Sequence, residues 1–401
     1  MDEGTRLGHL WSMPVSRESN PETPTASWPW REGNRFLLLE ASEQYLERMV
    51  AAIDDARSYV LLEMYLVESG VIAGRFVEAL VRSARRGVRV HVIVDGFGSL
   101  ALSQADRREL LDSGVELRVY NPLRLAKRLR NFIRDHRKLM LIDGEVAFVG
   151  GIGLTDAFGV VGPPGWPWRD LVAEIHGPVV ADWQRAFAQT WRTSGSPLLI
   201  PVPTIGIVSG EGARGRVALS EAWYRSELAS AVARRIIEAR GRAWIMSAYF
   251  VPSRRFRKAL RRAARRGVDV RLLVPGPLTD HPWVRQAARR FYGKLLRNGV
   301  RIFEFQPRVL HGKMTICDDW VSVGSSNLDR WSFKWNLEAN QEVESAALAQ
   351  AAAAVFEKDC ASSLELDRRH WPRRAALDRV QEQIAGAFDR WLERWRRPNS
   401  P

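Results

Sequence analysis

Residues 76–90 read FVEALVRSARRGVRV and residues 256–270 read FRKALRRAARRGVDV, so ten of these fifteen positions are identical. In each copy a stretch with helical spacing ends at Arg-Arg-Gly, and a glycine is the residue that most often ends a helix. Runs rich in β-branched residues follow, at 88–94 and 268–274. A helix that leads into such a run is one half of a β-α-β unit, so the repeat predicts a duplicated α/β domain.

The likeness extends outward from this repeat in both directions. Upstream, residues 59–64 resemble residues 243–248, and a tyrosine follows each run. Downstream, SGVEL at 113–117 parallels NGVRI at 298–302. The join between the copies is expected in the stretch 194–215, which is rich in serine, glycine and proline.

Composition bounds the class of protein. A chain of 401 residues with 46% hydrophobic and 26% charged residues is globular and long enough for two domains. We expect a disordered tail over 1–29, domains over 30–200 and 201–365, and a basic amphipathic segment over 366–401. The two cysteines exclude a disulfide framework. We find no signal peptide and no apolar run of the roughly 20 residues that span a bilayer.

A second pattern, His-x-Lys-x4-Asp, follows each copy of the repeat. Its members are His136, Lys138 and Asp143 in the first half, and His311, Lys313 and Asp318 in the second. Residues two apart on a strand face the same side, so each lysine is expected beside its histidine. The lysine then neutralises the non-bridging oxygens of a phosphodiester while one imidazole attacks phosphorus and the other serves as acid. This chemistry requires no metal or cofactor.

The aspartate of each motif is a weaker candidate for the chemistry. Asp143 lies an odd number of residues after Lys138, so on a continuous strand it faces the other way, and Asp-Gly is a hairpin signal. We expect these two aspartates to support turns, and acids elsewhere to orient the imidazoles. The candidates are Asp170 and Glu338, which follow their motifs by similar intervals.

Small residues follow each motif, as GGIG at 150–153 and GSSN at 324–327. Glycine lets backbone amides approach a phosphate, and serine and asparagine add donors. The predicted substrate-binding residues are Gly151, Ser325 and Asn327. One match to the motif is easily accidental, whereas two matches in the two halves of a repeat favour function over a structural role.

At these residues the sequence resembles the phospholipase D superfamily, from residue 30 to about 360. Within it the chain is most similar to bacterial cardiolipin synthases of the short, cardiolipin synthase B-like type. The strings that carry the likeness are WREGN at 30–34, LHGK at 310–313, VGSSNLD at 323–329 and NLEAN at 336–340.

The resemblance implies a duplicated phospholipase D fold, with two α/β/α sandwich domains whose mixed sheets are related by a pseudo-twofold axis. It implies transfer of a phosphatidyl group from one phosphatidylglycerol to another, with release of glycerol, through a phosphohistidine. His136 would be the nucleophile and His311 the acid and then the base, with Lys138 and Lys313 on the phosphate. Gly153 departs from the pattern, because an asparagine is usual at that position.

The net charge of +14 and the pI of about 10.4 favour an anionic partner, either a membrane or a nucleic acid. Residues 123–133 (LRLAKRLRNFI) alternate cations with apolar residues at helical spacing, and residues 377–395 carry an apolar stripe among arginines. Both segments favour an anionic phospholipid membrane, although the second also suits a helix packed on the protein's own core.

We expect a peripheral protein at the cytoplasmic face of the cell membrane, and no nucleic acid. The alternatives are a phospholipase D-type hydrolase or nuclease, or a binding protein with a degenerate site.

Overall fold

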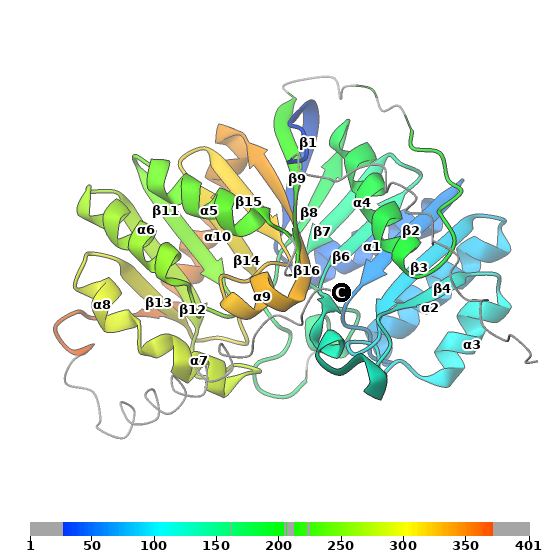
Figure 1. The fold of residues 1–401 in the computed structure, drawn as a ribbon, viewed down its shortest axis with the longest axis horizontal. Coiled ribbons are helices and arrows are strands. Elements are labelled where there is room, and N and C mark those ends of the chain that lie inside the picture. Colours follow the sequence, from blue (N-terminus) through cyan, green and yellow to red (C-terminus); the bar gives the residue numbers. More distant parts are fainter. Residues whose placement is uncertain (1–26, 161, 204–205, 207–211, 223–224, 372–401) are drawn as a thin grey trace, which may run out of the picture.

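The computed structural model describes residues 27–160, 162–203, 206, 212–222 and 225–371 (Figure 1). The predictions for the tail before residue 27 and for the amphipathic run 377–395 lie outside the described residues. Within these ranges, no helix combines the length and the apolar character that crossing a bilayer requires.

The first half builds one mixed sheet in the order β4-β3-β2-β6-β7-β8-β1. Strands β2, β3 and β4 run parallel, and the remaining neighbours are antiparallel. The strands are β1 (Arg31–Leu39), β2 (Tyr59–Met64), β3 (Arg89–Asp95), β4 (Glu116–Tyr120), β6 (Lys138–Ile142), β7 (Val146–Gly150) and β8 (Val172–His176).

The second half repeats this topology as β13-β12-β11-β14-β15-β16-β9, and β17 is added beside β13. Again the first three strands are parallel and the rest antiparallel. The strands are β9 (Ala213–Glu221), β11 (Arg242–Ser247), β12 (Asp269–Pro275), β13 (Arg301–Phe305), β14 (Lys313–Cys317), β15 (Trp320–Gly324), β16 (Asn336–Glu344) and β17 (Ser363–Glu365).

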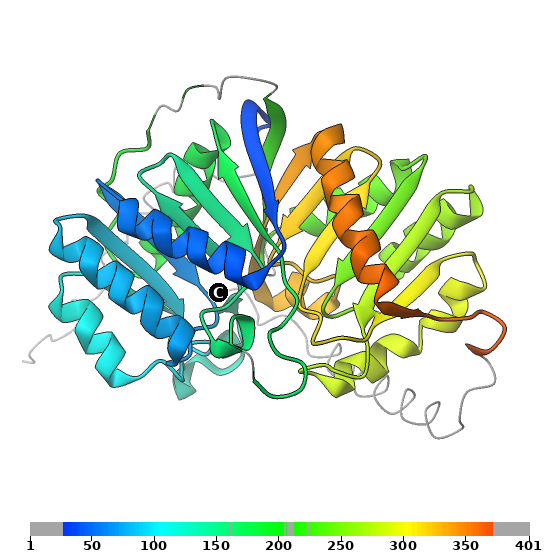
Figure 2. The same cartoon turned by 180° about the vertical axis from the view of Figure 1, so that it is seen from behind.

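Helices cover both faces of each sheet. In the first half α1, α2 and α3 lie on one face and α4 on the other; in the second half α5 and α6 lie opposite α10 (Figures 1 and 2). These helices are α1 (Ser42–Asp55), α2 (Val71–Arg85), α3 (Gln104–Asp112), α4 (Val179–Thr193), α5 (Glu227–Glu238), α6 (Arg254–Arg265) and α10 (Ala346–Ala361). The shorter elements are η1 (Leu125–Phe132), β5 (Arg134–Asp135), η2 (Asp156–Phe158), β10 (Arg225–Ser226), α7 (Pro282–Arg289), α8 (Tyr292–Leu296) and α9 (Arg330–Trp335).

The duplicated α/β fold predicted from the repeat is confirmed. Both copies of the repeat form a helix and the strand after it, α2 with β3 and α6 with β12. The glycines that follow these helices, Gly87 and Gly267, have φ of 90° and 91°. Residues with a β-carbon rarely adopt this left-handed conformation, which explains the Arg-Arg-Gly ending in both copies.

The two halves share one interior. Strand β1 pairs with β8 of the first sheet and with β9 of the second. A single apolar cluster contains Trp183 and Phe187 of α4 together with Phe356 of α10, and all three side chains are fully buried. Arg169 and Asp359 form a buried ion pair across the halves at 3.0 Å. The halves therefore stabilise each other, because separating them would expose this core and leave a buried charge unpaired.

Candidate active site

The backbone of each half places a histidine of one motif beside an acid of the other half. Short strand β5 pairs in parallel with the start of β16, with Asp135 opposite Leu337. The next residue, His136, continues this pairing, because its amide donates to the Leu337 carbonyl at 2.9 Å. Glu338 then lies beside the imidazole, and one of its carboxylate oxygens is 3.0 Å from His136 Nδ1.

The second motif repeats this arrangement with the halves exchanged. A parallel bridge joins Arg169 to Leu310, and the His311 amide donates to the Arg169 carbonyl at 2.8 Å. Asp170 follows, and its Oδ2 lies 2.6 Å from His311 Nδ1. Each imidazole therefore has its Nδ1 beside a buried carboxylate of the opposite half. This leaves Nε2 of His136 for a substrate, whereas Nε2 of His311 lies 3.2 Å from Lys313 Nζ. Intervals along the sequence pointed to both acids but not to this exchange.

The lysines stand where the motif strands begin. Lys138 is the first residue of β6 and Lys313 the first of β14, whereas both histidines precede these strands. The strand predicted across the whole motif is thus shorter than expected, because the amides of the histidines bond to the other half. Lys138 Nζ donates to the His136 carbonyl at 2.6 Å, and Lys313 Nζ lies 2.8 Å from His311 Nδ1.

This group lies at the carboxyl edge of both sheets. Lys138 pairs with Met64, the last residue of β2, and Lys313 pairs with Ser247, the last residue of β11. Parallel strands present this edge to ligands in open α/β sheets.

Burial controls the protonation of the two imidazoles. His136 is 8% exposed and His311 6% exposed. Burial lowers the pKa of His136 to about 4, although Glu338 raises it in part. Burial and the nearby Lys313 ammonium also lower the pKa of His311, against the effect of Asp170. A neutral His136 whose Nδ1–H is donated to Glu338 has its Nε2 lone pair free, as a nucleophile requires.

The same burial acts on the two ammonium groups. It lowers the pKa of Lys138 to about 7, although Glu338 raises it in part. It also lowers the pKa of Lys313, against the effects of Asp170 and Asp280. A bound phosphodiester anion would favour the charged form of both lysines and so suits this site.

Aromatic rings enclose the histidines. The ring of Tyr65 meets that of His136 edge-on at 4.7 Å, and the Lys138 ammonium lies 4.9 Å from the same tyrosine ring. Phe158 and Trp168 lie 5.3 Å and 5.4 Å from His311. Sequence reasoning missed Tyr65 and Phe158 as parts of the site; the signal for Tyr65 was its place after the first repeated strand, which Tyr249 occupies in the second.

The motif aspartates lie at turns and away from the imidazoles. Asp143 has φ of 53° and Asp318 has φ of 51°. The Asp143 carboxylate accepts the amides of residues 57–59 at 2.7–2.8 Å. The Asp318 carboxylate accepts those of residues 240–242 at 2.8–3.0 Å. Each aspartate thus ties its hairpin to the chain that enters the first parallel strand of its sheet.

The small residues after the motifs contact the two acids. The Ser325 hydroxyl donates to Glu338 at 2.5 Å and accepts the Ala339 amide at 3.0 Å. At the matching position Gly151 makes room for Asp170, because a β-carbon there would lie 2.5 Å from that carboxylate. These contacts place both residues behind the acids, as supports.

Asn327 is the exception in this cluster, because half of its amide has no protein partner. Its Oδ1 accepts the Tyr249 amide at 3.2 Å, while its buried Nδ2 makes no hydrogen bond. At the matching position a β-carbon on Gly153 would lie 2.9 Å from Leu66. The first half therefore offers no equivalent amide donor, and the site is asymmetric.

In the part of the chain that the structure describes, no three His, Cys, Asp or Glu side chains are grouped so as to hold a metal ion.

Comparison with known proteins adds independent information. Residues 49–158 and 232–360, together more than half of the chain, match a family model described as cardiolipin synthase, PLD-like domain. The chain is 37% identical over 325 residues to cardiolipin synthase B of Escherichia coli (strain K12), covering 78% of this chain and 76% of that relative. It is 36% identical over 349 residues to cardiolipin synthase A of Pseudomonas aeruginosa (strain LESB58), covering 85% and 70%.

A solved structure agrees with this fold. The chain is similar to phosphatidylserine synthase of Haemophilus influenzae Rd KW20, with a TM-score of 0.67 over 89% of this chain and 93% of that one. The sequence identity of 13% limits this likeness to the fold.

Proposed function

The chain belongs to the phospholipase D superfamily and, within it, to the bacterial cardiolipin synthases, and from this premise we propose how its paired motif transfers a phosphatidyl group. Its relatives make it a phosphatidyltransferase that acts on phospholipid. The proposed donor and acceptor are both phosphatidylglycerol, and the products are cardiolipin and glycerol. The reaction passes through a covalent phosphatidyl-histidine and uses only side chains of this chain.

In the first step His136 Nε2 attacks the phosphorus of one phosphatidylglycerol. The bond from phosphorus to the glycerol headgroup oxygen breaks, and His311, in the protonated form that Asp170 stabilises, gives its proton to that oxygen. Lys138 and Lys313 neutralise the non-bridging oxygens, where charge builds up in the transition state. Glycerol leaves, and the phosphatidyl group stays on His136.

In the second step a headgroup hydroxyl of another phosphatidylglycerol enters the space left by glycerol. Neutral His311 accepts its proton while the hydroxyl oxygen attacks phosphorus. The bond between phosphorus and His136 breaks, and the product carries two phosphatidyl groups on one glycerol. His136 is neutral again and His311 is protonated, so the enzyme returns to its starting state.

One observation supports these roles above all: each Nδ1 is paired with a buried carboxylate from the other half, Glu338 for His136 and Asp170 for His311. Such a pair fixes the ring and stabilises its positive charge when Nε2 is bonded or protonated. The arrangement also explains why the proposal needs both halves in one site, since each motif histidine takes its acid from the other half.

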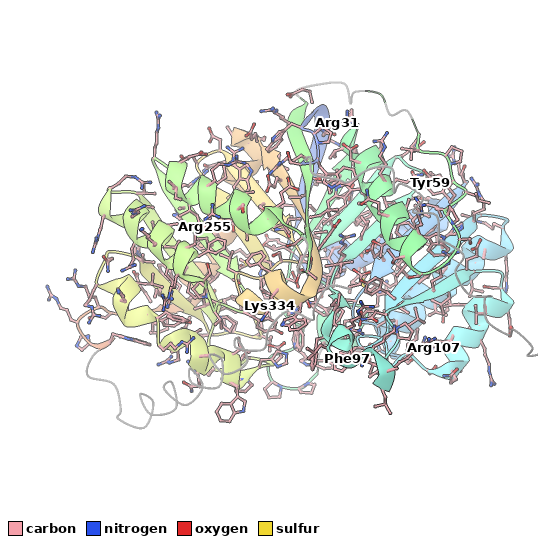
Figure 3. The ribbon with its side chains drawn as sticks, in the orientation of Figure 1. Arg31, Tyr59, Phe97, Arg107, Arg255 and Lys334 are labelled. Carbon is pink, nitrogen blue, oxygen red and sulfur yellow. The ribbon has the colours of Figure 1, made fainter. Side chains whose placement is uncertain are left out.

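We propose that the enzyme acts while bound to the surface of an anionic membrane. Residues 123–133 form the 3₁₀ helix η1 at their centre, rather than a regular α-helix. Leu125 in this segment is 99% exposed, and the adjoining cavity is lined by Arg124, Lys127 and Arg130. Phe97, in the loop after β3, is also exposed (Figure 3). Exposed apolar residues among cations at the carboxyl edge favour contact with an anionic lipid surface.

The test is product analysis with vesicles that contain phosphatidylglycerol. We expect cardiolipin and free glycerol in equal amounts from the wild-type protein, and neither from His136→Ala. Phosphatidic acid as the main product would identify a hydrolase. Nicking of plasmid DNA without lipid turnover would identify a nuclease.

A further inference from the structure

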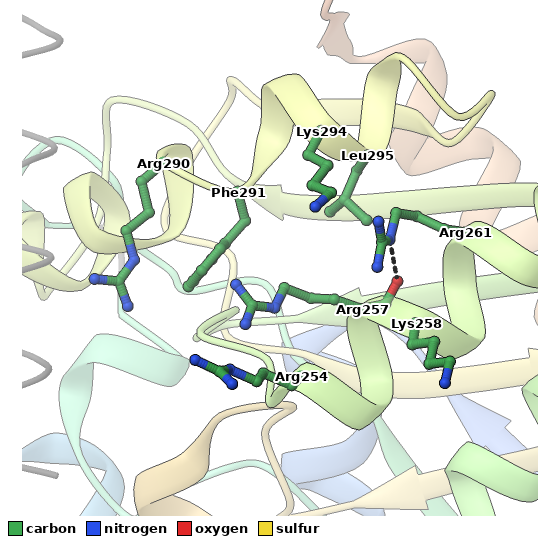
Figure 4. Close-up of a pocket in the computed structure, with 8 residues that line it drawn as sticks. All are labelled: Arg254, Arg257, Lys258, Arg261, Arg290, Phe291, Lys294 and Leu295. Atoms are coloured by element: carbon green, nitrogen blue, oxygen red, sulfur yellow. Dashed lines mark hydrogen bonds between the residues drawn. The ribbon is translucent and has the colours of Figure 1, made fainter.

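A cationic cavity lies on the second half, between α6 and α8. Its volume is about 440 Å³. Its lining residues are Arg254, Arg257, Lys258, Arg261, Arg290, Phe291, Lys294 and Leu295 (Figure 4). Six of these eight side chains are cations, and none of the eight is a carboxylate. None of the six cations belongs to the histidine–lysine group described above.

Packing fixes the inner part of this cavity. The guanidinium groups of Arg257 and Arg290 lie 4.1 Å and 4.4 Å from the centre of the Phe291 ring. Arg261 Nε donates to the Arg257 carbonyl at 3.0 Å (Figure 4). Cations held against an aromatic ring lose less freedom when they bind a ligand than mobile surface cations do.

The internal repeat shows that this cationic face belongs to the second half alone. Arg257, Lys258 and Arg261 of α6 correspond to Val77, Glu78 and Val81 of α2. The two valines are buried in a core that includes Leu110 of α3. The same helix therefore buries apolar residues in the first half, whereas in the second half it lines an open cavity with cations.

Four of the six cations, Arg254, Arg257, Lys258 and Arg261, come from α6. The helix begins at Arg254, and the Ser253 hydroxyl caps it by accepting the Phe256 amide at 3.3 Å. The cationic side of the cavity is therefore carried by one regular, capped helix.

We propose that this cavity binds the headgroup of an anionic phospholipid, apart from the catalytic histidines. The cations contact the phosphate. Helix α7, which directly precedes Arg290 and Phe291 of the cavity lining, carries Trp283 with 68% of its surface exposed. A tryptophan of this kind suits the boundary between headgroups and acyl chains and favours a lipid over a nucleic acid. The choice of ligand rests on the proposed function.

The experiment measures binding to vesicles in a His136→Ala background, so that no turnover changes the lipid. The test variant is Arg254→Gln/Lys258→Gln/Lys294→Gln. The matched control is Arg255→Gln/Arg262→Gln/Arg265→Gln, which removes the same charge from α6 outside the cavity (Arg255 is labelled in Figure 3). With phosphatidylcholine vesicles that contain phosphatidylglycerol, we expect the test variant to bind at least about tenfold more weakly, since each cation at an anionic surface contributes about fivefold.

The control should lose clearly less affinity, and vesicles of phosphatidylcholine alone should bind weakly to every variant. Lys258→Glu serves as a second test with little risk to folding, because the first copy carries Glu78 at this position; it should weaken binding as well. Equal losses in the test and control triple variants would overturn the proposal in favour of diffuse surface charge.

Two further results would also overturn the proposal. One is soluble glycerol phosphate binding to the cavity as tightly as vesicles do, which would identify a site for a free phosphate. The other is a larger effect of the test variant on binding of a DNA duplex than on binding of vesicles. Failure of the product assay leaves this binding result unchanged, so the two proposals fail separately.

Discussion

At the scale of single residues, Glu338 and Asp170 give two similar imidazoles different surroundings. Glu338 also accepts from Ser325 and Asn336, whereas Asp170 accepts the amide of Leu171. The acid beside the nucleophile is therefore more heavily hydrogen-bonded than the acid beside the proton donor. A carboxylate that accepts fewer hydrogen bonds stabilises a neighbouring imidazolium more strongly. Asp170 therefore favours His311 as the acid, and His136 beside Glu338 is left as the nucleophile.

Substituting the two acids should have different consequences. We expect Asp170→Asn to slow reaction of phosphatidylglycerol by about 10²–10⁴-fold, the range of general acid catalysis. A phosphatidyl ester of p-nitrophenol should restore most of the first step, because this leaving group needs no proton. Glu338→Gln should lose activity on both substrates, because it acts on the nucleophile. Identical responses of the two variants, in burst kinetics with both substrates, would contradict the assignment.

Lys138 gives a prediction for pH. Burial lowers its pKa to about 7, so at pH 8 the ammonium of the empty enzyme is largely neutral. A bound phosphodiester anion favours the charged form and raises this pKa, so binding takes up protons between about pH 7 and pH 10. Calorimetry of glycerophosphoglycerol binding in buffers of different ionisation enthalpy should detect this uptake, and Lys138→Met should reduce it. Proton release on binding would contradict the predicted rise in the pKa of Lys138.

Several site residues were predictable and others were not. The two histidines and two lysines were predicted from the repeated motif, and Asp170 and Glu338 from their similar intervals after it. The only signal for Tyr65 is its place after the first repeated strand, which also fits a core residue, and Phe158 lies in η2, where no motif points to it. Ser325 and Gly151 were predicted to contact a phosphate, and the structure places them against Glu338 and Asp170.

At the scale of elements, the hairpins after the motifs depend on their aspartates. Burial raises the pKa of Asp318, but the backbone amides of Arg240, Arg242 and Gly241 together bring it below its usual range. The ionised form is therefore the stabilising one. Its contribution is complete above the ordinary carboxyl pKa of about 4 and is lost as the pH falls through the lowered value.

Asp318→Asn should accordingly destabilise the fold by about 0.5–1.5 kcal/mol at pH 7, the usual net contribution of a hydrogen bond, because water can reach the exposed amides that lose their charged acceptor. Asparagine tolerates the positive φ, so the loss reports on the hydrogen bonds. Urea unfolding at pH 7 and at pH 3 measures it, and the difference from wild type should shrink at the lower pH. The variant should keep far more activity per folded molecule than His311→Ala. A loss of activity as large as that of His311→Ala, with little loss of stability, would indicate that Asp318 takes part in the chemistry.

The spacing of apolar residues along the sequence predicted helices and strands well where local sequence determines them. It was less accurate for segments whose backbone hydrogen-bond partners come from the other half. The motif strands begin at the lysines because His136 and His311 donate their amides across the interface. Residues 123–133 have helical spacing, but their central part, Leu125–Phe132, is a 3₁₀ helix. Lys127 in this part donates its Nζ to Asn121 Oδ1 at 2.8 Å.

At the scale of the whole molecule, duplication explains why one site needs both halves. Each half supplies a histidine, a lysine and the acid for its counterpart, and the shared core holds these groups in register. The repeat predicted two copies of one fold, and nothing in either copy alone specified the exchange of acids. That information lies in the pairing of β5 with β16 and of Arg169 with Leu310.

Mass spectrometry of the intact protein after a rapid acid-free quench, followed by peptide mapping, tests this account most directly. With His311→Ala and the p-nitrophenol ester, departure of the leaving group needs no acid, whereas transfer to the next hydroxyl lacks its base. We predict that a phosphatidyl adduct accumulates on His136 and that His136→Ala forms none. An adduct on any other residue, or full transfer activity in His136→Ala, would contradict the central claim.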